Sequence, residues 1–162
     1  MYSAKTIKNV SIKPNVSIKP PVLEFKVKKL HEDAIIPTKA HKSDSGWDLY
    51  ILDDIEIKPK ETVIIPTGIA IKLPPFYEAQ VRPRSGVTSK TKLRVQLGTI
   101  DNDYTGDIGI IVDNTGDEPI ALNSGYKLAQ LVVQQLPNTV IEVVDDLEHG
   151  VRGDKGFGSS GV

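Results

Sequence analysis

The sequence predicts an all-β protein, a jelly-roll-like β-barrel that carries one short helix. Three observations favour this fold class. Short runs of β-branched residues alternate with polar ones, which is typical of strands with one buried face. The 13 glycines and 11 prolines are spread along the chain and punctuate these runs as turn signals. At 162 residues the chain suits one domain with a proper hydrophobic core, and many short strands in one domain favour a closed or double-sheet arrangement.

The expected strands follow one another closely from residue 25 onward. Pro59, Pro66 and the pair Pro74-Pro75 end successive runs, because proline cannot donate a hydrogen bond to a neighbouring strand. We expect one helix, at residues 86–92, starting immediately after Ser85. Strands are expected at residues 25–29, 47–51, 55–58, 62–65, 68–73, 77–82, 93–97, 107–112, 120–122, 128–135 and 139–144.

Both ends of the chain differ from the middle, which predicts three parts. Residues 1–24 are rich in lysine and proline and repeat Asn-Val-Ser-Ile-Lys-Pro at positions 9–14 and 15–20, as expected for a solvated tail. An arm that binds an acidic partner or pairs with a sheet edge is the alternative. Residues 25–145 form the barrel domain. Residues 146–162 are expected to form a mobile, Gly-rich arm that could extend about 50 Å onto a neighbouring subunit.

Composition excludes several classes of function. A net charge of −1 gives no basic field for nucleic acid. The apolar runs are too short to span a membrane, and the start lacks the apolar core of a secretory signal. There is no cysteine for a disulfide or a thiolate metal site, and the three histidines lack metal-site spacing. We therefore expect a protein without nucleic-acid or membrane partners, located in the cytoplasm, or in the host cytoplasm if a phage encodes it.

Residues 98–106, Gly-Thr-Ile-Asp-Asn-Asp-Tyr-Thr-Gly, have the composition of a hairpin between two strand-like flanks. The backbone groups of a hairpin can hydrogen-bond the edge of a flat ligand. Asp101 follows Ile100, which is expected to be buried, so its carboxylate would be fixed near that ligand. The alternative is an ordinary turn whose Asp and Asn side chains bond their own backbone.

Three further segments could carry chemistry. Residues 81–86, Val-Arg-Pro-Arg-Ser-Gly, suit phosphate, although Ser85 could instead cap the helix. The C-terminal Gly-Phe-Gly-Ser-Ser-Gly, with Arg152 and Lys155 before it, suits phosphate and a planar ligand; a flexible terminus is the alternative. Asp48 could hold Mg²⁺ through water, or could bond nearby backbone at a strand end.

Five segments stand in one order along the chain, at residues 45–49, 83–86, 98–106, 125–131 and 152–161. This set resembles the five motifs of the homotrimeric dUTPases, from about residue 30 to residue 162. The resemblance implies a jelly-roll homotrimer that hydrolyses dUTP at three active sites, each built from all three subunits. It implies in-line attack of water on the α-phosphorus, assisted by Mg²⁺, with dUMP and pyrophosphate as products.

The resemblance also implies roles for individual residues. Asp101 would be the base that activates water, and Asp48 would organise Mg²⁺ through its water shell. Tyr104 would stack under the deoxyribose and exclude a 2′-hydroxyl. The backbone that reads uracil would be that of Gly98, Thr99 and Ile100, and the residues near the phosphates or the water would be Arg84, Ser85, Gly86 and Gln130. Those that close over the nucleotide from another subunit would be Arg152, Phe157, Gly158, Ser159 and Ser160, with Phe157 on the base.

The sequence departs from the family pattern at four positions. Ser45 replaces the usual Ala and Trp47 the usual Tyr or Phe, which are mild changes. Val95 stands where some relatives carry an Asn that reads uracil, so base selection would rest on backbone. Tyr126 stands where the family has Asp or Glu, which removes an acidic partner expected for Arg84.

Three other functions compete with this one. A dCTP deaminase would share the fold, but it would need a catalytic Glu near the base and an Arg-Ser-Ser segment, whereas Gly86 follows Ser85 here. A nucleotide-sensing protein would use the arm or the tail to bind a regulatory protein partner, which need not exclude catalysis. A purely structural jelly roll would not require the five segments.

Overall fold

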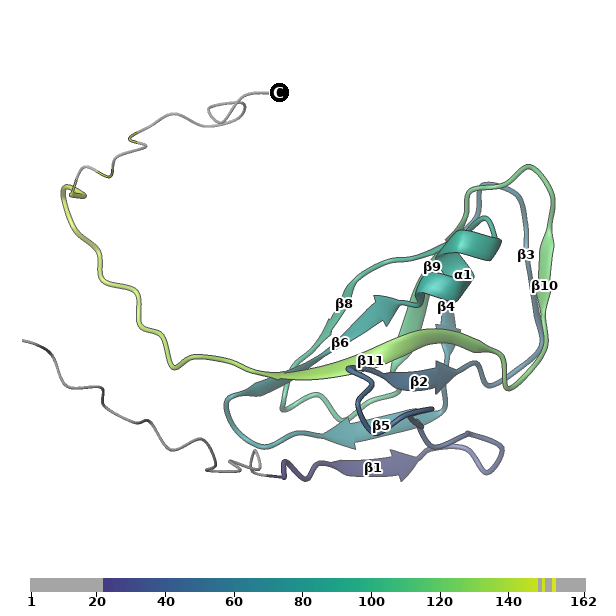
Figure 1. Ribbon diagram of the computed structural model, residues 1–162, viewed down its shortest axis with the longest axis horizontal. Coiled ribbons are helices and arrows are strands. Elements are labelled where there is room, and N and C mark those ends of the chain that lie inside the picture. The colour runs from purple at the N-terminus through teal and green to yellow at the C-terminus, as the bar shows by residue number, and fades with distance from the viewer. Residues whose placement is uncertain (1–21, 149, 151–152, 154–162) are drawn as a thin grey trace, which may run out of the picture.

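The computed structural model describes residues 22–148, 150 and 153. Within these residues the chain forms eleven strands and one helix, and the strands make up most of the body in Figure 1. The elements are β1 (Lys26–Lys29), β2 (Trp47–Tyr50), β3 (Ile55–Ile57), β4 (Thr62–Pro66), β5 (Ile69–Lys72), β6 (Tyr77–Pro83), α1 (Ser85–Lys90), β7 (Leu93–Val95), β8 (Gly98–Ile100), β9 (Gly109–Asn114), β10 (Ile120–Leu122) and β11 (Lys127–Gln135). The predicted fold class, a jelly-roll-like all-β protein with one short helix, is confirmed.

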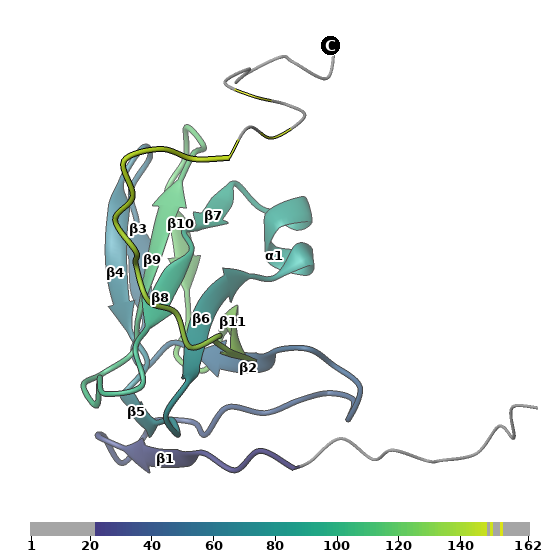
Figure 2. The same cartoon turned by 90° about the vertical axis from the view of Figure 1, so that its left-hand side faces the viewer.

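The strands pair antiparallel in four groups. A four-stranded sheet has the order β2-β11-β6-β8, and a three-stranded sheet has the order β4-β9-β7. The pairs β1-β5 and β10-β3 complete the barrel. Figure 2 shows β1 and β5 at one end of the strands and α1 beside β6 and β7. Most pairings join strands distant in sequence, so the sheets bring separate segments side by side.

The core lies between these sheets and forms one cluster. Burial alternates along the strands as the sequence pattern predicts: in β9, Ile110 and Val112 are fully buried while their neighbours are partly exposed. Leu49, Val81 and Leu131 from three adjacent strands join the same cluster. Each such aliphatic side chain contributes about 1.5–3 kcal/mol through its burial, so the cluster is the main stabilising feature.

Asn114 is a buried polar residue that ties β9 to its surroundings. Its Nδ2 donates to the Ile57 carbonyl at 3.0 Å and to the Glu118 carbonyl at 2.8 Å. Its Oδ1 accepts from the Gly116 amide at 2.9 Å, so one side-chain amide satisfies three backbone groups. Because unpaired buried backbone groups are costly, this side chain is part of what holds the loop after β9.

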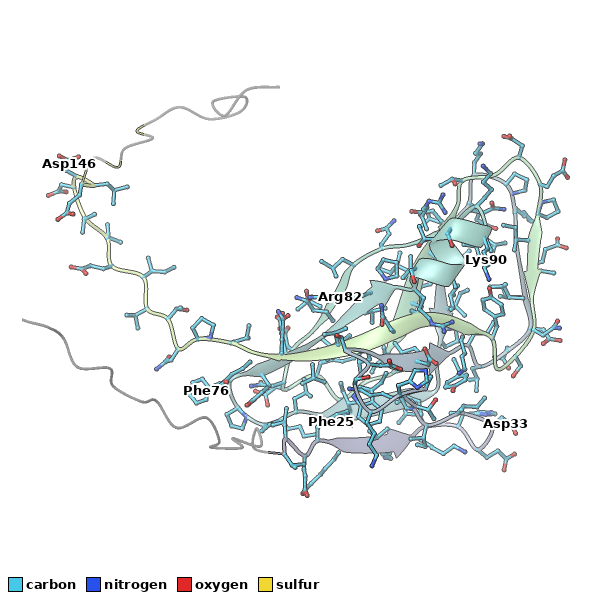
Figure 3. The ribbon with its side chains drawn as sticks, viewed as in Figure 1. Phe25, Asp33, Phe76, Arg82, Lys90 and Asp146 are labelled. Carbon is cyan, nitrogen blue, oxygen red and sulfur yellow. The ribbon has the colours of Figure 1, made fainter. Side chains whose placement is uncertain are left out.

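Three local expectations were wrong. Residues 139–144 do not form a strand: no described segment pairs with them, and Val140 and Ile141 are 92% and 95% exposed. Figures 1 and 3 show this segment running away from the barrel toward Asp146. Residues 98–106 were expected to be the turn of a hairpin between two strands. The flanking strands β7 and β9 do pair, but residues 98–100 within the expected turn form a further strand, β8, which pairs with β6. The helix begins at Ser85 rather than after it, with Arg84 at the N-cap and no side-chain cap, so Ser85 does not cap it.

No helix within the described part of the chain has the length and apolar character needed to cross a membrane.

Asn114→Ala is expected to lower the free energy of unfolding by about 2–4 kcal/mol, because it leaves three backbone groups without partners. Urea denaturation measures the change. Asn123→Ala is the matched control, since Asn123 is exposed and is expected to change stability by less than about 0.5 kcal/mol. Equal stability of the two variants would contradict the role given to Asn114.

Candidate active site

A polar cleft of about 390 Å³ collects three of the predicted segments. The pairing of β11 with both β2 and β6 explains this, since Gln130 is opposite Asp48 on one side and Arg82 on the other. Strand β6 ends at Pro83, so the residues that follow it reach the same cleft. The lining residues are Ala40, Asp44, Ser45, Gly46, Asp48, Arg84, Ser85, Gly86 and Gln130.

Gln130 is held in the cleft by one hydrogen bond and one close contact. Its Nε2 donates to the Pro83 carbonyl at 2.9 Å, which joins β11 to the segment before α1. Gly46 lies directly against it: a Cβ at Gly46 would lie 2.9 Å from the Gln130 Cβ, closer than real side chains approach. Only glycine therefore leaves Gln130 in this position.

Asp48 carries two ion pairs beside the cleft. Its Oδ1 lies 2.9 Å from Arg84 Nε, and its Oδ2 lies 2.9 Å from Lys127 Nζ. The Asp48 side chain is 13% exposed, and partial burial strengthens both interactions. The neighbouring carboxylate raises the pKa of the Lys127 ammonium, first through their hydrogen bond and then through the opposite charge. Lys127 therefore stays protonated at neutral pH.

Arg84 finds other partners in place of the acid that position 126 lacks. Arg84 Nη1 donates to the Lys127 carbonyl at 2.8 Å, and Arg84 takes Asp48 as its acidic partner. The segment 125–131 therefore holds Arg84 through its backbone, whichever side chain stands at Tyr126. Asp48 was alternatively expected to bond nearby backbone, but among the described residues its carboxylate pairs with the side chains of Arg84 and Lys127.

The structure does not bring the hairpin residues to this cleft. None of the residues from Gly98 to Tyr104 lines it. Strand β8 is the last strand of its sheet and pairs with β6 alone in the described chain, so its outer backbone edge is open. Ile100 is 9% exposed, as expected, and Asp101 follows it at the exposed start of a turn closed by the Tyr104 amide and the Asp101 carbonyl.

Tyr104 is fixed over that turn. Its hydroxyl donates to the Asp107 carbonyl at 2.8 Å, and its side chain remains about half exposed. A Cβ at Gly106 would lie 2.6 Å from the Tyr104 hydroxyl oxygen, so Gly106 is required for the ring to lie this close to the backbone. The ring thus presents a flat, partly exposed apolar surface on the same turn as Asp101.

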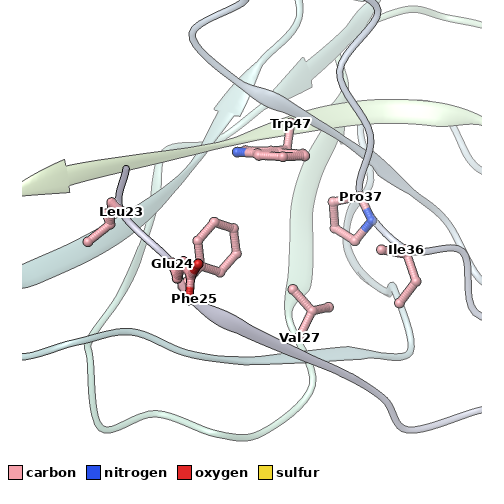
Figure 4. Close-up of a pocket in the computed structure, with 7 residues that line it drawn as sticks. All are labelled: Leu23, Glu24, Phe25, Val27, Ile36, Pro37 and Trp47. Atoms are coloured by element: carbon pink, nitrogen blue, oxygen red, sulfur yellow. The ribbon is translucent and has the colours of Figure 1, made fainter. Parts of the chain in front are cut away.

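A second cleft of about 360 Å³ is apolar and contains none of the predicted chemistry-bearing side chains. Figure 4 shows Phe25 and Trp47 within it, and their rings meet edge to face at 6.0 Å. Lys39 Nζ lies 5.0 Å from the Trp47 ring. The lining is Leu23, Glu24, Phe25, Val27, Ile36, Pro37 and Trp47.

Sequence reasoning missed Lys127, Gly46 and Asp44 as parts of the polar cleft and its surroundings. Lys127 lies within one of the five segments, but only the strand register shows that it reaches Asp48. Five predicted residues lie outside the described part of the chain: Arg152, Phe157, Gly158, Ser159 and Ser160.

Comparisons with known proteins agree with the fold. The dUTPase family model matches residues 32–161. The deoxyuridine 5′-triphosphate nucleotidohydrolase of Clostridioides difficile is 47% identical over 139 residues, covering 85% of this chain and 97% of that protein. The protein of the same name from Gloeothece citriformis is 44% identical over 142 residues, covering 86% and 98%.

Solved structures of phage enzymes share the fold. The Staphylococcus bacteriophage 80alpha dUTPase with dUpNHpp superposes with a TM-score of 0.82 at 30% identity, covering 86% of this chain and 99% of that one. A mutant dUTPase from phage phi11 of S. aureus, described with a structural Mg(II) ion, gives 0.74 at 28% identity, covering 77% and 99%.

The family match over most of the chain, together with the jelly-roll fold, defines a nucleotide-hydrolysing enzyme. The chain belongs to the dUTPase family, and its activity is the hydrolysis of dUTP.

Gly46→Ala is expected to raise the KM for dUTP about tenfold, because the added methyl group displaces Gln130 from the cleft. Steady-state kinetics measure the change. Gly109→Ala is the matched control, since a Cβ there would also crowd a side chain, at 2.7 Å from Ile64 Cγ2, but outside the cleft. Its KM is expected to equal that of the wild type. An unchanged KM in Gly46→Ala would remove Gln130 from the binding site.

Proposed function

We propose that dUTP is hydrolysed by in-line attack of an Asp101-activated water on the α-phosphorus, at a site shared between subunits. One observation carries the proposal: the phosphate-type groups line one cleft, while Asp101 and Tyr104 lie in the turn after β8, at the tip of the hairpin segment 98–106, and do not line that cleft. A complete site then needs the hairpin of one subunit beside the cleft of another. The products are dUMP and pyrophosphate.

The cleft supplies the groups for the triphosphate. Ser85 and Gly86 offer a hydroxyl and backbone amides at its rim, and Arg84 adds a guanidinium. Gln130 has a second Nε2–H for a phosphate oxygen, since one Nε2–H already donates to the Pro83 carbonyl, and its side-chain carbonyl can accept a hydrogen bond from the attacking water. Fixed donors around the phosphates give the positioning and charge neutralisation on which phosphoryl transfer depends.

The hairpin supplies the groups for the nucleoside and the base. The open edge of β8 at Gly98, Thr99 and Ile100 can pair with the edge of uracil, so that cytosine would leave backbone groups unpaired. Tyr104 packs under the deoxyribose, where a 2′-hydroxyl would meet its ring. Asp101 accepts a proton from water on a carboxylate oxygen, which contributes roughly 10²–10⁴-fold to the rate.

The residues of the cleft fit Mg²⁺ held through water. Both oxygens of Asp48 already contact cations, so the carboxylate suits hydrogen bonds from the waters around the ion better than direct coordination. Mg²⁺ commonly keeps several waters and binds through substrate phosphates with few carboxylates. The ion would neutralise charge on the triphosphate, and Asp48 would orient its water shell.

The assembly we propose is a homotrimer in which the C-terminal part of one chain reaches another subunit. Val140, Ile141 and Val143 are each more than 90% exposed in the single chain, which is costly for aliphatic side chains in water. Burial against a neighbouring subunit removes this cost. The residues that follow, Arg152 and 157–160, would then close over the nucleotide, with Phe157 on the base.

Binding of a regulatory protein is a second candidate function for the same chain. The structure of the 80alpha phage dUTPase is described as that of a protein that controls transfer of virulence genes by a proto-oncogenic G protein-like mechanism. A pull-down with this chain would retain such a partner, and added dUTP would release it.

Asp101→Asn is expected to bind dUTP with wild-type affinity and to lose roughly 10²–10⁴-fold in kcat, because an amide cannot accept the proton of the attacking water. Calorimetric titration with dUpNHpp and release of pyrophosphate from dUTP measure the two effects. Retained turnover would exclude Asp101 as the base. The preference for dUTP over UTP, dTTP and dCTP should be unchanged in whatever activity remains.

Co-expression of two variants tests the shared site: Asp101→Asn alters the turn after β8, and Ser85→Ala alters the cleft. In trimers assembled from equal amounts of Asp101→Asn and Ser85→Ala chains, about a quarter of the sites pair an intact hairpin with an intact cleft. Co-expression is therefore expected to restore about a quarter of the wild-type rate, whereas mixing after separate assembly restores none. Failure of co-expressed chains to regain activity, in trimers confirmed by mass, would place both halves in one subunit.

A further inference from the structure

Lys127, the first residue of β11, lies at a break in the pairing between β11 and β2. Lys127 is opposite Tyr50, but Ala129 is opposite Leu49, so β11 contains one extra residue here. Leu128 and Ala129 are consecutive and both fully buried, which a regular strand with one buried face would not allow. A bulge re-aims the side chains beside it, and here the ammonium of Lys127 reaches Asp48.

Lys127 contacts both charged groups beside the cleft. Its Nζ lies 2.9 Å from Asp48 Oδ2, and its backbone carbonyl accepts a hydrogen bond from Arg84 Nη1 at 2.8 Å. Arg84 Nε and Asp48 Oδ1, 2.9 Å apart, close the ring of three residues. The aromatic ring of Tyr50, with its centroid 5.6 Å from Nζ, adds a cation–π contact to the ammonium.

The ring of three residues carries a net charge of +1, from two cations and one carboxylate. Asp44 also lines the cleft and adds a negative charge, so an anion would be held by the directed donors of Arg84 and not by the total charge of the cleft. Arg84 and Asp48 line the cleft, while Lys127 does not, so Lys127 acts from behind Asp48. Arg84 has five N–H groups, of which two are engaged in this ring. Without the Lys127 ammonium, Arg84 would be the remaining ion-pair partner of Asp48 in the described chain, and the pair would be neutral.

We propose that Lys127 is a positioning residue for polyphosphate binding. Its ammonium takes one oxygen of Asp48, so Asp48 compensates less of the positive charge of Arg84, and the remaining donors of Arg84 stay available for the phosphates. The role rests on the proposed function, because it concerns the same cleft. It acts on binding of the phosphate chain and not on the attacking water, which lies with the hairpin.

The test compares Lys127→Met with Lys127→Arg in the full chain. Lys127→Met is expected to weaken the binding of inorganic triphosphate about tenfold and to raise the KM for dUTP by a similar factor, with kcat within about twofold of wild type. Lys127→Arg keeps the charge, so its affinity for inorganic triphosphate and its KM for dUTP are expected to stay within about twofold of wild type. Lys127→Gln is neutral but can hydrogen-bond Asp48, and its affinity for inorganic triphosphate is expected to fall as much as that of Lys127→Met.

A second ion pair of the same chain provides the control. Lys60 Nζ lies 2.9 Å from Asp117 Oδ1, the same separation as in the Lys127 pair, and neither residue lines the polar cleft. Lys60→Met is expected to bind inorganic triphosphate as the wild type does. Urea unfolding of each variant shows whether a loss of binding reflects a loss of folding.

Two results would overturn the inference: wild-type affinity for triphosphate in both neutral variants, or a loss in Lys127→Arg as large as in Lys127→Met. These failures are distinct from failure of the proposed function. If Asp101→Asn keeps its turnover while Lys127→Met loses triphosphate binding, the proposed mechanism is wrong and the role of Lys127 stands.

Discussion

The site depends on one constraint, the pairing of β11 on both of its edges. Strand β11 lies between β2 and β6, so residues from three distant parts of the chain meet across neighbouring strands. Gln130 is opposite Asp48 on one side and Arg82 on the other, and Arg84 follows where β6 ends. The buried residues of these strands fix this register, because a shift by one residue would expose them all; they include Leu49, Val81 and Leu131. The core therefore holds the cleft in place.

Local patterns were sufficient to predict most of the strands. Alternation and proline positions predicted the run from β2 to β6 with small errors at the ends, and residues 120–122 were predicted without error. The same pattern failed at residues 139–144, because an alternating segment becomes a strand only when a partner is available, and the single chain offers none among the described residues. The pairing of β8 with β6 could not be predicted from the local sequence pattern either, because it depends on the tertiary fold.

The candidate site was predictable in its segments but not in its contacts. Composition and order pointed to residues 45–49, 83–86 and 125–131, and the structure brings these three together at one cleft. The ring of Asp48, Arg84 and Lys127 was not predictable, because it depends on a bulge and on pairings between residues far apart in the sequence. The family pattern implies an acid at position 126 as a partner for Arg84. Here the Lys127 backbone carbonyl accepts a hydrogen bond from Arg84 instead, and any residue at position 127 would supply that carbonyl.

The ion pairs also bear on which carboxylate can act as the base. Asp48 lies beside the cleft, but each of its oxygens pairs with a cation, Arg84 on one and Lys127 on the other, so taking a proton from water would cost both ion pairs. Asp101 has no ion-pair partner among the described residues and stands at an exposed turn. The cations Arg84 and Lys127 lie beside the cleft and the proposed base Asp101 lies in the turn after β8, so Asp101 does not pair with Arg84 within its own chain. Assembly can then bring the two together around a triphosphate, whose own negative charge occupies the cations.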